Sequence, residues 1–298
     1  MRISWPLALV LALVPACLPA CSSPQTDKST LGRAAAAQAA GEPDGIRATS
    51  SGGAQQGDSI GYFLNKIDER VRAWSNLKLD ARTESELHTQ NLLEQTLQYD
   101  TKRRVDELVA QLESGPPRNR AIAAVGLGFS GMPQAQPALL AALTDPDSHV
   151  VSNALLGLGV LGAADTPTAE IAYVLRTHRD SWTRNNAAFA LQRIATAQSG
   201  GARDPELAAS LREALADEMA GVRAQCAATL GALHDAESVR PLSDLLYDGE
   251  NLVAFAAAGA LASIGSQVPE QKGPTARALV AAYSRARSER RPSLQREL

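Results

Sequence analysis

The sequence predicts an all-α protein, an α-solenoid of about five stacked helical hairpins preceded by an N-terminal helical pair. Hydrophobic residues fill 45% of the 298 positions but aromatic residues only 4%, and alanine alone occupies 54 positions. This composition favours helices that pack closely through small side chains, because sheets prefer β-branched and aromatic residues. A second observation is an Ala/Gly-rich segment that recurs at nearly constant spacing, which is typical of stacked helical units.

The N-terminal residues 1–20 have the layout of an export signal. Arg2 precedes an apolar run from Trp5 to Val14, which is far shorter than the ~20 residues that a membrane-spanning helix needs. Two kinds of export signal fit this layout: one in which a cysteine near its end has a role, described below, and an ordinary cleaved signal whose cysteines are incidental. With a formal net charge of −3, the chain does not have the bulk basicity of a general nucleic-acid binder.

The signal ends in the sequence Leu-Pro-Ala-Cys21, which resembles the lipobox of bacterial lipoproteins. That resemblance implies that Cys21 is acylated and becomes the first residue of a chain anchored to the membrane of the cell envelope. Ser22 follows the cysteine, so in a Gram-negative cell the resemblance implies the periplasmic face of the outer membrane. A poorer copy of the motif ends at Cys17, which leaves two candidates for the acylated residue.

Residues 21–58 predict a flexible linker, because this segment is rich in Ser, Gly, Pro and Ala and has no periodic apolar positions. A helical pair is predicted at 59–113. Its first helix has apolar residues at helical spacing from Ile60 to Leu77. Its second helical stretch begins at a capping box, Thr83 to Glu86, and runs to Leu112, and the sequence leaves open a break near Asp100. The pair could cap the following array or project from it.

The repeats are predicted over residues 118–284. Five Ala/Gly-rich segments can be aligned, with equivalent positions at 128, 159, 192, 231 and 262. Each is followed by a second helix with leucine or another aliphatic residue at helical spacing. The turns before Val150, Val222 and Val253 begin with an aspartate five residues earlier. One such hairpin cannot bury both faces alone, whereas stacked copies share a continuous core.

This pattern resembles HEAT repeats, specifically the short bacterial type that also occurs in phycobilisome lyase subunits. The closest match begins at Asp217, continues through Val222 and Arg223, and ends in an Ala-Ala-x-Leu-Gly-x-Leu segment. The resemblance implies that Asp217 and Arg223 form a structural pair in a ladder between neighbouring units. Val151 and Ala254 replace the arginine in two other copies, and His178 stands before Arg184 where an aspartate would be, so only a partial ladder is expected.

The pattern of chemically reactive residues favours a protein without catalytic activity, metal or cofactor. The four histidines form no His-x-x-x-His or His-Glu-x-x-His pair of the kind that binds a metal on a helix. Cys226 lies on an Ala-rich helix and is interpreted as a small buried hydrophobic residue.

The predicted binding surface is the concave face of the solenoid, which in HEAT arrays is lined by the second helices. Arginine and tyrosine, which are enriched at binding hot spots, recur among the positions outside the core. The candidate binding residues are Tyr173, Arg176, Arg212, Glu213, Arg240, Asp244 and Tyr247. Residues 285–298 are predicted to form a basic, solvated C-terminal tail.

Two classes of function fit these observations. The first is a membrane-anchored scaffold or adaptor that binds a protein or peptide partner in the cell envelope, without nucleic acid. The alternative is an accessory subunit of the lyase-like HEAT type that handles a cofactor or small molecule. The sequence predicts neither the partner nor the oligomeric state.

Overall fold

The computed structural model describes residues 59–80, 83–198 and 204–288, and this part of the chain contains helices and no strands. Its α-helices are α1 (Ile60–Asp80), α2 (Glu84–Lys102), α3 (Val105–Ser114), α4 (Pro117–Phe129), α5 (Ala135–Ala141), α6 (Ser148–Leu161), α7 (Ala169–Thr177), α8 (Ser181–Ala197), α9 (Pro205–Glu213), α10 (Ala220–Ala232), α11 (Val239–Leu245), α12 (Asn251–Gln267) and α13 (Lys272–Ser288). The predicted all-α solenoid is confirmed. The predicted signal, linker and acylated cysteine lie outside the described residues.

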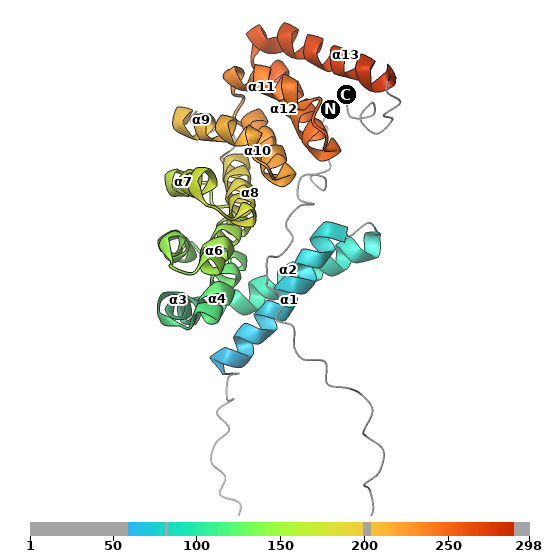
Figure 1. The fold of residues 1–298 in the computed structure, drawn as a ribbon. Coiled ribbons are helices and arrows are strands. Elements are labelled where there is room, and N and C mark those ends of the chain that lie inside the picture. Colours follow the sequence, from blue (N-terminus) through green and yellow to red (C-terminus); the bar gives the residue numbers. More distant parts are fainter. Residues whose placement is uncertain (1–58, 81–82, 199–203, 289–298) are drawn as a thin grey trace, which may run out of the picture.

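The helices from α3 to α12 form two layers that follow an arc (Figure 1). The Ala/Gly-rich helices α4, α6, α8, α10 and α12 form one layer, and α3, α5, α7, α9 and α11 form the other. The first of these layers lies on the inner, concave side of the arc and the second on the outer side. Alternating helices along the chain therefore belong to opposite sides of the molecule.

The inner layer is tightly packed because its helices meet at small residues. A Cβ added at Gly128 of α4 would lie 2.5 Å from the backbone of Gly157 in α6, and one at Gly231 of α10 would lie 2.6 Å from the Cα of Ala260 in α12. Larger side chains would force these helices apart. Because the layer with the closer spacing must be the shorter one, this packing explains why the array curves toward the Ala/Gly-rich helices.

Helix α6 illustrates how the sequence builds one inner helix. The Asp147 side chain accepts a hydrogen bond from the backbone N–H of His149 at the N-terminus. Gly162 ends the helix in the left-handed conformation with φ of 56°, which glycine adopts without a steric penalty. All ten residues from 150 to 159 are buried, because α4 and α8 flank the helix and the outer layer lies behind it.

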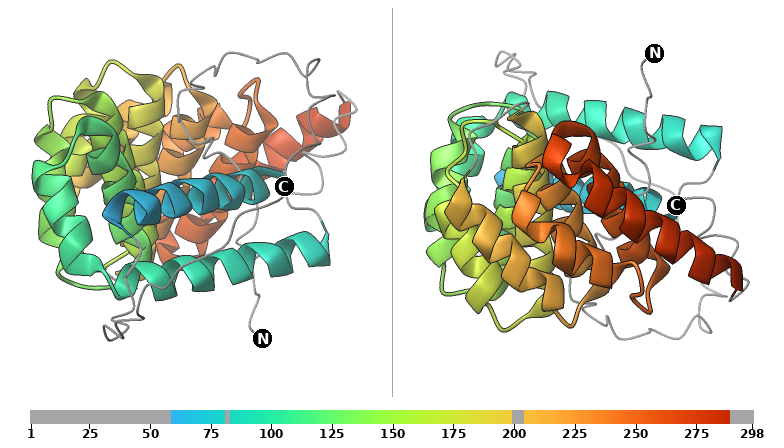
Figure 2. Two further views of the ribbon diagram at one scale, coloured as in Figure 1. Left: turned by 90° about the horizontal axis from the view of Figure 1, so that it is seen from below. Right: turned by 90° about the horizontal axis from the view of Figure 1, so that it is seen from above.

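The N-terminal region differs from the predicted pair, because it contains three helices. The capping box at Thr83 and Glu86 is confirmed, and α2 then ends near Arg103. The following helix α3 packs along α4 and so belongs to the solenoid. Helices α1 and α2 contact α4 and extend toward the open side of the arc (Figures 1 and 2). The ring of Trp74 on α1 meets Phe129 of α4 edge to face, with ring centroids 5.1 Å apart.

Helix α13 covers the other end of the array and packs on α12 and α11 (Figure 2). It continues to Ser288, so the expected boundary between solenoid and tail at residue 285 is wrong for residues 285–288. No acidic residue lies between 272 and 288 to interrupt the helix or to repel its C-terminal dipole. The rest of the predicted tail, from residue 289, lies outside the described part.

Candidate interaction surfaces

A ladder of ion pairs joins neighbouring units along one edge of the solenoid. The guanidinium groups of Arg120, Arg184 and Arg223 each donate two hydrogen bonds to an aspartate at the start of the next unit's turn. The pairs are Arg120–Asp145 at 2.8 and 2.9 Å, Arg184–Asp217 at 2.6 and 3.1 Å, and Arg223–Asp248 at 2.9 and 3.0 Å. Two parallel N–H···O bonds to a carboxylate fix orientation as well as distance, so each rung holds two units in register.

Each aspartate of the ladder also caps its own turn. Asp145 accepts a hydrogen bond from the backbone N–H of Asp147, and Asp248 accepts one from Glu250, both at 2.8 Å. Partial burial opposes ionisation of these two carboxyls. Their hydrogen bonds from arginine and from the turn nevertheless keep the pKa of both Asp145 and Asp248 below its ordinary value. Asp145 and Asp248 are therefore ionised at neutral pH.

The expected pair of Asp217 and Arg223 takes a different form. Their side chains do not pair with each other, because Asp217 binds Arg184 of the preceding unit and Arg223 binds Asp248 of the following unit. The Arg223 guanidinium also donates to the backbone carbonyls of Asp217 at 2.8 Å and Glu218 at 3.1 Å. Both residues belong to a ladder between neighbouring units, as the resemblance implied, but they take part in two different rungs and do not form one pair.

The rung that would join α6 to the turn before α8 is absent. Val151 occupies the arginine position and His178 the aspartate position, so both partners of the same rung are replaced. His178 still closes its turn, because its Nδ1 accepts a hydrogen bond from the backbone N–H of Asp180 at 3.1 Å. The two departures that the sequence showed separately are therefore one structural change.

A second set of contacts fastens the inner helices to one another. The amide of Asn153 donates to the backbone carbonyl of Ala121 at 3.0 Å, and the amide of Asn186 donates to that of Ser152 at 3.1 Å. Both asparagines are less than 10% exposed. Because a buried amide must be hydrogen-bonded, these contacts fix the inner layer and leave these amide donors committed.

Six of the seven residues predicted to bind a partner lie on α7, α9 and α11, which form the outer layer and not the concave face, and Tyr247 lies in the turn directly after α11. The predicted concave placement is wrong because it assigned the second helix of each hairpin to the inner side. Tyr173 is 61% exposed and Tyr247 is 43% exposed. Arg176, Glu213, Arg240 and Asp244 are exposed as well.

Two of these residues already have partners within the chain. Arg212 is half-buried and pairs with Asp235 at 2.7 Å and Glu237 at 2.9 Å, in the turn after α10. It therefore joins neighbouring units, a role that sequence reasoning missed. The guanidinium of Arg285 on α13 lies 4.8 Å from the ring centroid of Tyr247, a cation–π contact between α13 and the turn after α11.

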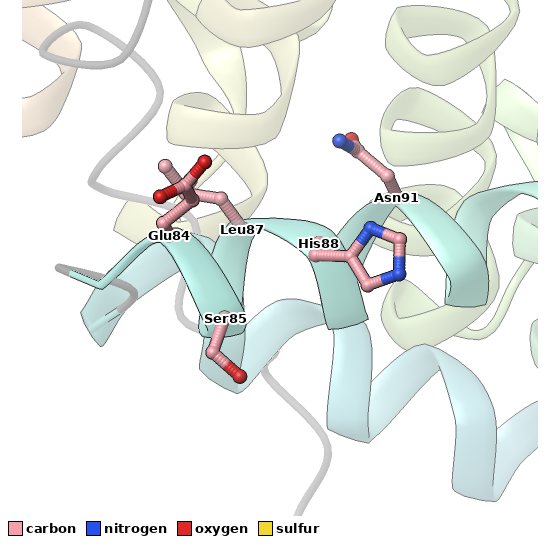
Figure 3. Close-up of a pocket in the computed structure, with 5 residues that line it drawn as sticks. All are labelled: Glu84, Ser85, Leu87, His88 and Asn91. Atoms are coloured by element: carbon pink, nitrogen blue, oxygen red, sulfur yellow. The ribbon is translucent and has the colours of Figure 1, made fainter.

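An exposed apolar surface that the sequence analysis did not single out lies on α1 and α2. Tyr62, Leu87, Leu92 and Tyr99 are between 46% and 62% exposed. An open hollow beside Leu87 is lined by Glu84, Ser85, His88 and Asn91, all from the first two turns of α2 (Figure 3). Leu92 lies outside the apolar face that the sequence predicts for this helix, which is the signal that could have revealed it, whereas the sequence places Leu87 on that face and the structure exposes it.

A reactive cysteine, a metal site or a membrane-spanning helix would be a further candidate site in the part of the chain that the structure describes. Burial raises the pKa of the Cys226 thiol well above its ordinary range, which suits a packed core residue. Within the described ranges, no group of three or more His, Cys, Asp or Glu residues is placed to hold a metal ion. None of the helices described is both long and apolar enough to cross a membrane.

The two-layered stack of short helical hairpins, with its ladder of Arg–Asp pairs, defines an α-solenoid of the helical-repeat class. The family model for HEAT repeats matches residues 105–192 and 168–262, and together these matches span more than half of the chain. The chain therefore belongs to the HEAT-repeat family. A search of the curated proteins gave no match.

Engineered repeat proteins are among the solved structures with the same fold. Two engineered proteins match with TM-scores of 0.51 and 0.52 at 24% and 22% identity, and each match covers 65% of this chain and 92% or 96% of the other. A designed armadillo repeat protein matches with a TM-score of 0.50 at 19% identity, covering 65% of this chain and 96% of its own. The complex of CpcE and CpcF of phycocyanin lyase from Nostoc sp. PCC7120 superposes less well, with a TM-score of 0.40 at 18% identity over 86% of this chain and 100% of that chain. These likenesses concern the fold alone.

Proposed function

We propose that this protein is a lipoprotein of the cell envelope whose HEAT-repeat stack is a scaffold for a protein partner. Support for the scaffold comes from the family, because HEAT arrays present extended surfaces on a rigid stack. Support for the anchor comes from the motif that ends at Cys21. The proposed role is binding and positioning, without a catalytic step.

The observation that carries the proposal is the uneven distribution of exposed apolar side chains. Eight large hydrophobic residues are exposed in the described part, and four of them, Tyr62, Leu87, Leu92 and Tyr99, lie on the two helices α1 and α2. Gatherings of exposed apolar residues mark interaction sites on soluble proteins, and tyrosine is enriched among residues that dominate binding energy. We therefore place the main partner contact on α1 and α2.

The chemistry of this surface indicates a partner with an apolar, weakly charged contact region. Between Leu87 and Tyr99, α2 has Glu94 as its only Asp, Glu, Lys or Arg residue. The Glu94 carboxylate accepts hydrogen bonds from the Trp74 indole at 2.7 Å and from the Gln90 amide at 3.1 Å, so it is committed within the helical pair. The two tyrosines each have a neighbouring cation, because Lys66 Nζ lies 4.4 Å from the ring centroid of Tyr62 and Arg103 donates a hydrogen bond to the Tyr99 hydroxyl at 2.7 Å. A partner would therefore meet leucine and uncharged amides in the middle of α2 and a tyrosine with a cation beside it at Tyr62 and at Tyr99.

Photo-crosslinking in living cells tests where the partner binds. A photoreactive amino acid at Leu92 should give a discrete crosslinked species, whereas the same group at Tyr173 of the outer layer should not. The substitutions Leu87→Ser and Tyr99→Ser together should abolish that species, while circular dichroism shows unchanged helix content. Crosslinking at Tyr173 alone would instead place the partner on the outer layer, and an unchanged species in the double variant would contradict the proposed surface.

Metabolic labelling with an alkyne fatty acid tests the anchor independently. The proposal expects that Cys21→Ala abolishes labelling and releases the protein from the membrane fraction, whereas Cys17→Ala leaves both unchanged. The opposite pattern would move the acylated residue to Cys17. Labelling that is the same in both variants as in the unaltered chain would contradict lipid anchoring through this motif.

A further inference from the structure

The last helix has a charge that differs from the rest of the molecule. Between residues 272 and 288 the chain has four basic residues, Lys272, Arg277, Arg285 and Arg287, and no Asp or Glu. The whole chain has a formal net charge of −3. The positive charge is therefore local to α13 and is not part of a generally basic protein.

Helix α13 has two faces. Thr275, Ala282 and Ala286 are buried at helical spacing against the neighbouring helices α11 and α12. The outward face has Arg277, Val280 and Ser284, which follow one another at intervals of three and four residues and are all exposed. Val280 is 65% exposed and Tyr283 beside it is 41% exposed.

The exposed surface of α13 combines two cations, Arg277 on the outward face and Lys272 at the start of the helix, with exposed valine and tyrosine and with no carboxylate in the helix, which is the chemistry of a lipid-surface contact. Cations near an anionic leaflet gain electrostatic attraction, and valine and tyrosine side chains enter the boundary between headgroups and acyl chains. Tyrosine is suited to this boundary because its ring is apolar and its hydroxyl remains hydrated. Lys272 and Arg277 are both exposed and would meet the phosphates.

We propose that the outward face of α13 binds an anionic lipid bilayer. The contact goes beyond the partner-binding role of α1 and α2 and does not require acylation of the chain. An acyl anchor would strengthen it, since a tethered helix meets the bilayer at a high effective concentration. The bilayer would then hold the array at its C-terminal end while α1 and α2 remain available at the other end.

The test uses an environment-sensitive fluorescent amino acid at position 280 of the full chain, titrated with vesicles. Vesicles of phosphatidylcholine containing phosphatidylglycerol should shift its emission to shorter wavelength, and pure phosphatidylcholine should not. The same amino acid at Tyr173, a residue of similar exposure on α7, should show no shift. High salt should reverse the shift at position 280, because the contact is electrostatic.

Charge reversal provides the matched control. Lys272→Glu with Arg277→Glu should weaken binding to the anionic vesicles about tenfold or more, whereas Arg176→Glu with Arg240→Glu on the outer layer should leave it unchanged. Circular dichroism verifies that both variants are folded. Equal shifts with both lipids, no shift at position 280, or equal losses in the two double variants would overturn the inference.

The same titration separates this inference from the proposed anchor. Co-sedimentation with neutral vesicles, together with no shift at position 280 on anionic vesicles, would support acylation and reject the α13 contact. A shift at position 280 on anionic vesicles, without co-sedimentation on neutral ones, would support the α13 contact and count against the anchor.

Discussion

Helices α2 and α6 show how differently two parts of one helical protein are packed. Helix α2 buries three of its 19 residues, whereas α6 buries ten of 14. Helix α6 lies between α4 and α8 with the outer layer behind it, while α2 packs mainly on α1 and one end of α4. The comparison teaches that the stacked units supply the stability of the fold, and that the N-terminal helices leave apolar surface available for binding.

The largest expected effect comes from removing a core side chain from the stack. Leu158 of α6 is fully buried, so Leu158→Ala should lower the free energy of unfolding by about 2–5 kcal/mol. Its control on α2 is Leu92→Ala, where a side chain 48% exposed should cost within about 0.5 kcal/mol. Urea denaturation followed by circular dichroism measures both, and equal losses would contradict the comparison.

A smaller loss is expected where the inner helices touch. The Cβ introduced by Gly128→Ala would lie 2.5 Å from the Gly157 backbone, so two helices must separate, at a cost of about 1–3 kcal/mol. Gly61→Ala on α1 meets nothing within 4 Å and should stabilise the helix by about 0.5–1 kcal/mol. The opposite signs can be measured by thermal unfolding, and a stabilising Gly128→Ala would show that the inner layer is looser than described.

The ladder should contribute less than the core, and its contribution should depend on pH. Arg223→Ala removes two hydrogen bonds from Asp248 and should cost about 1–2 kcal/mol at neutral pH. The lowered pKa of Asp248 in the folded state means that this stability is present above the ordinary carboxyl pKa of about 3.9. It is lost as the pH falls through the folded-state pKa. Urea titrations at a series of pH values should therefore show the variant and the unaltered protein converging in acid.

The smallest effect is the gain from restoring the absent rung. Val151→Arg combined with His178→Asp should stabilise the protein by up to about 1 kcal/mol more than the two single changes predict. Each single variant should be neutral or destabilising, because it adds one charge without its partner. A double-mutant cycle measures the coupling, and its absence would show that Val151 and His178 do not face one another as a rung.

Much of the stack could be predicted from the sequence because its signals are local and repeated. The recurring Ala/Gly segments predict the inner helices, and the aspartate turns mark where they begin. The capping box at Thr83 predicts the start of α2 to the residue. Such features depend on periodicity and capping, which a single chain displays directly.

Prediction from the sequence fails where the position of a residue depends on three-dimensional packing. Periodicity predicts which helices pair but not which layer is inner, so Tyr173 and Tyr247 were placed on the wrong face. The Ala/Gly content of the first helices could have identified the inner layer. Close contacts such as that of Gly128 with Gly157 shorten this layer and bend the array toward it. The ladder between units was predicted, but its individual pairs were not, because Asp217 and Arg223 each pair with a residue that is distant in the sequence, Arg184 and Asp248.

Hydrogen exchange of the free protein, resolved along the chain, tests most directly whether the repeats are the stable scaffold and the N-terminal helices the exposed binding element. The account predicts that backbone amides of α6 and α10 exchange orders of magnitude more slowly than those of α2, because opening the stack exposes buried core on both sides. Equal protection in α2 and α6 would contradict it. The N-terminal helices would then be an integral cap of the solenoid, and the partner contact would have to lie on another surface.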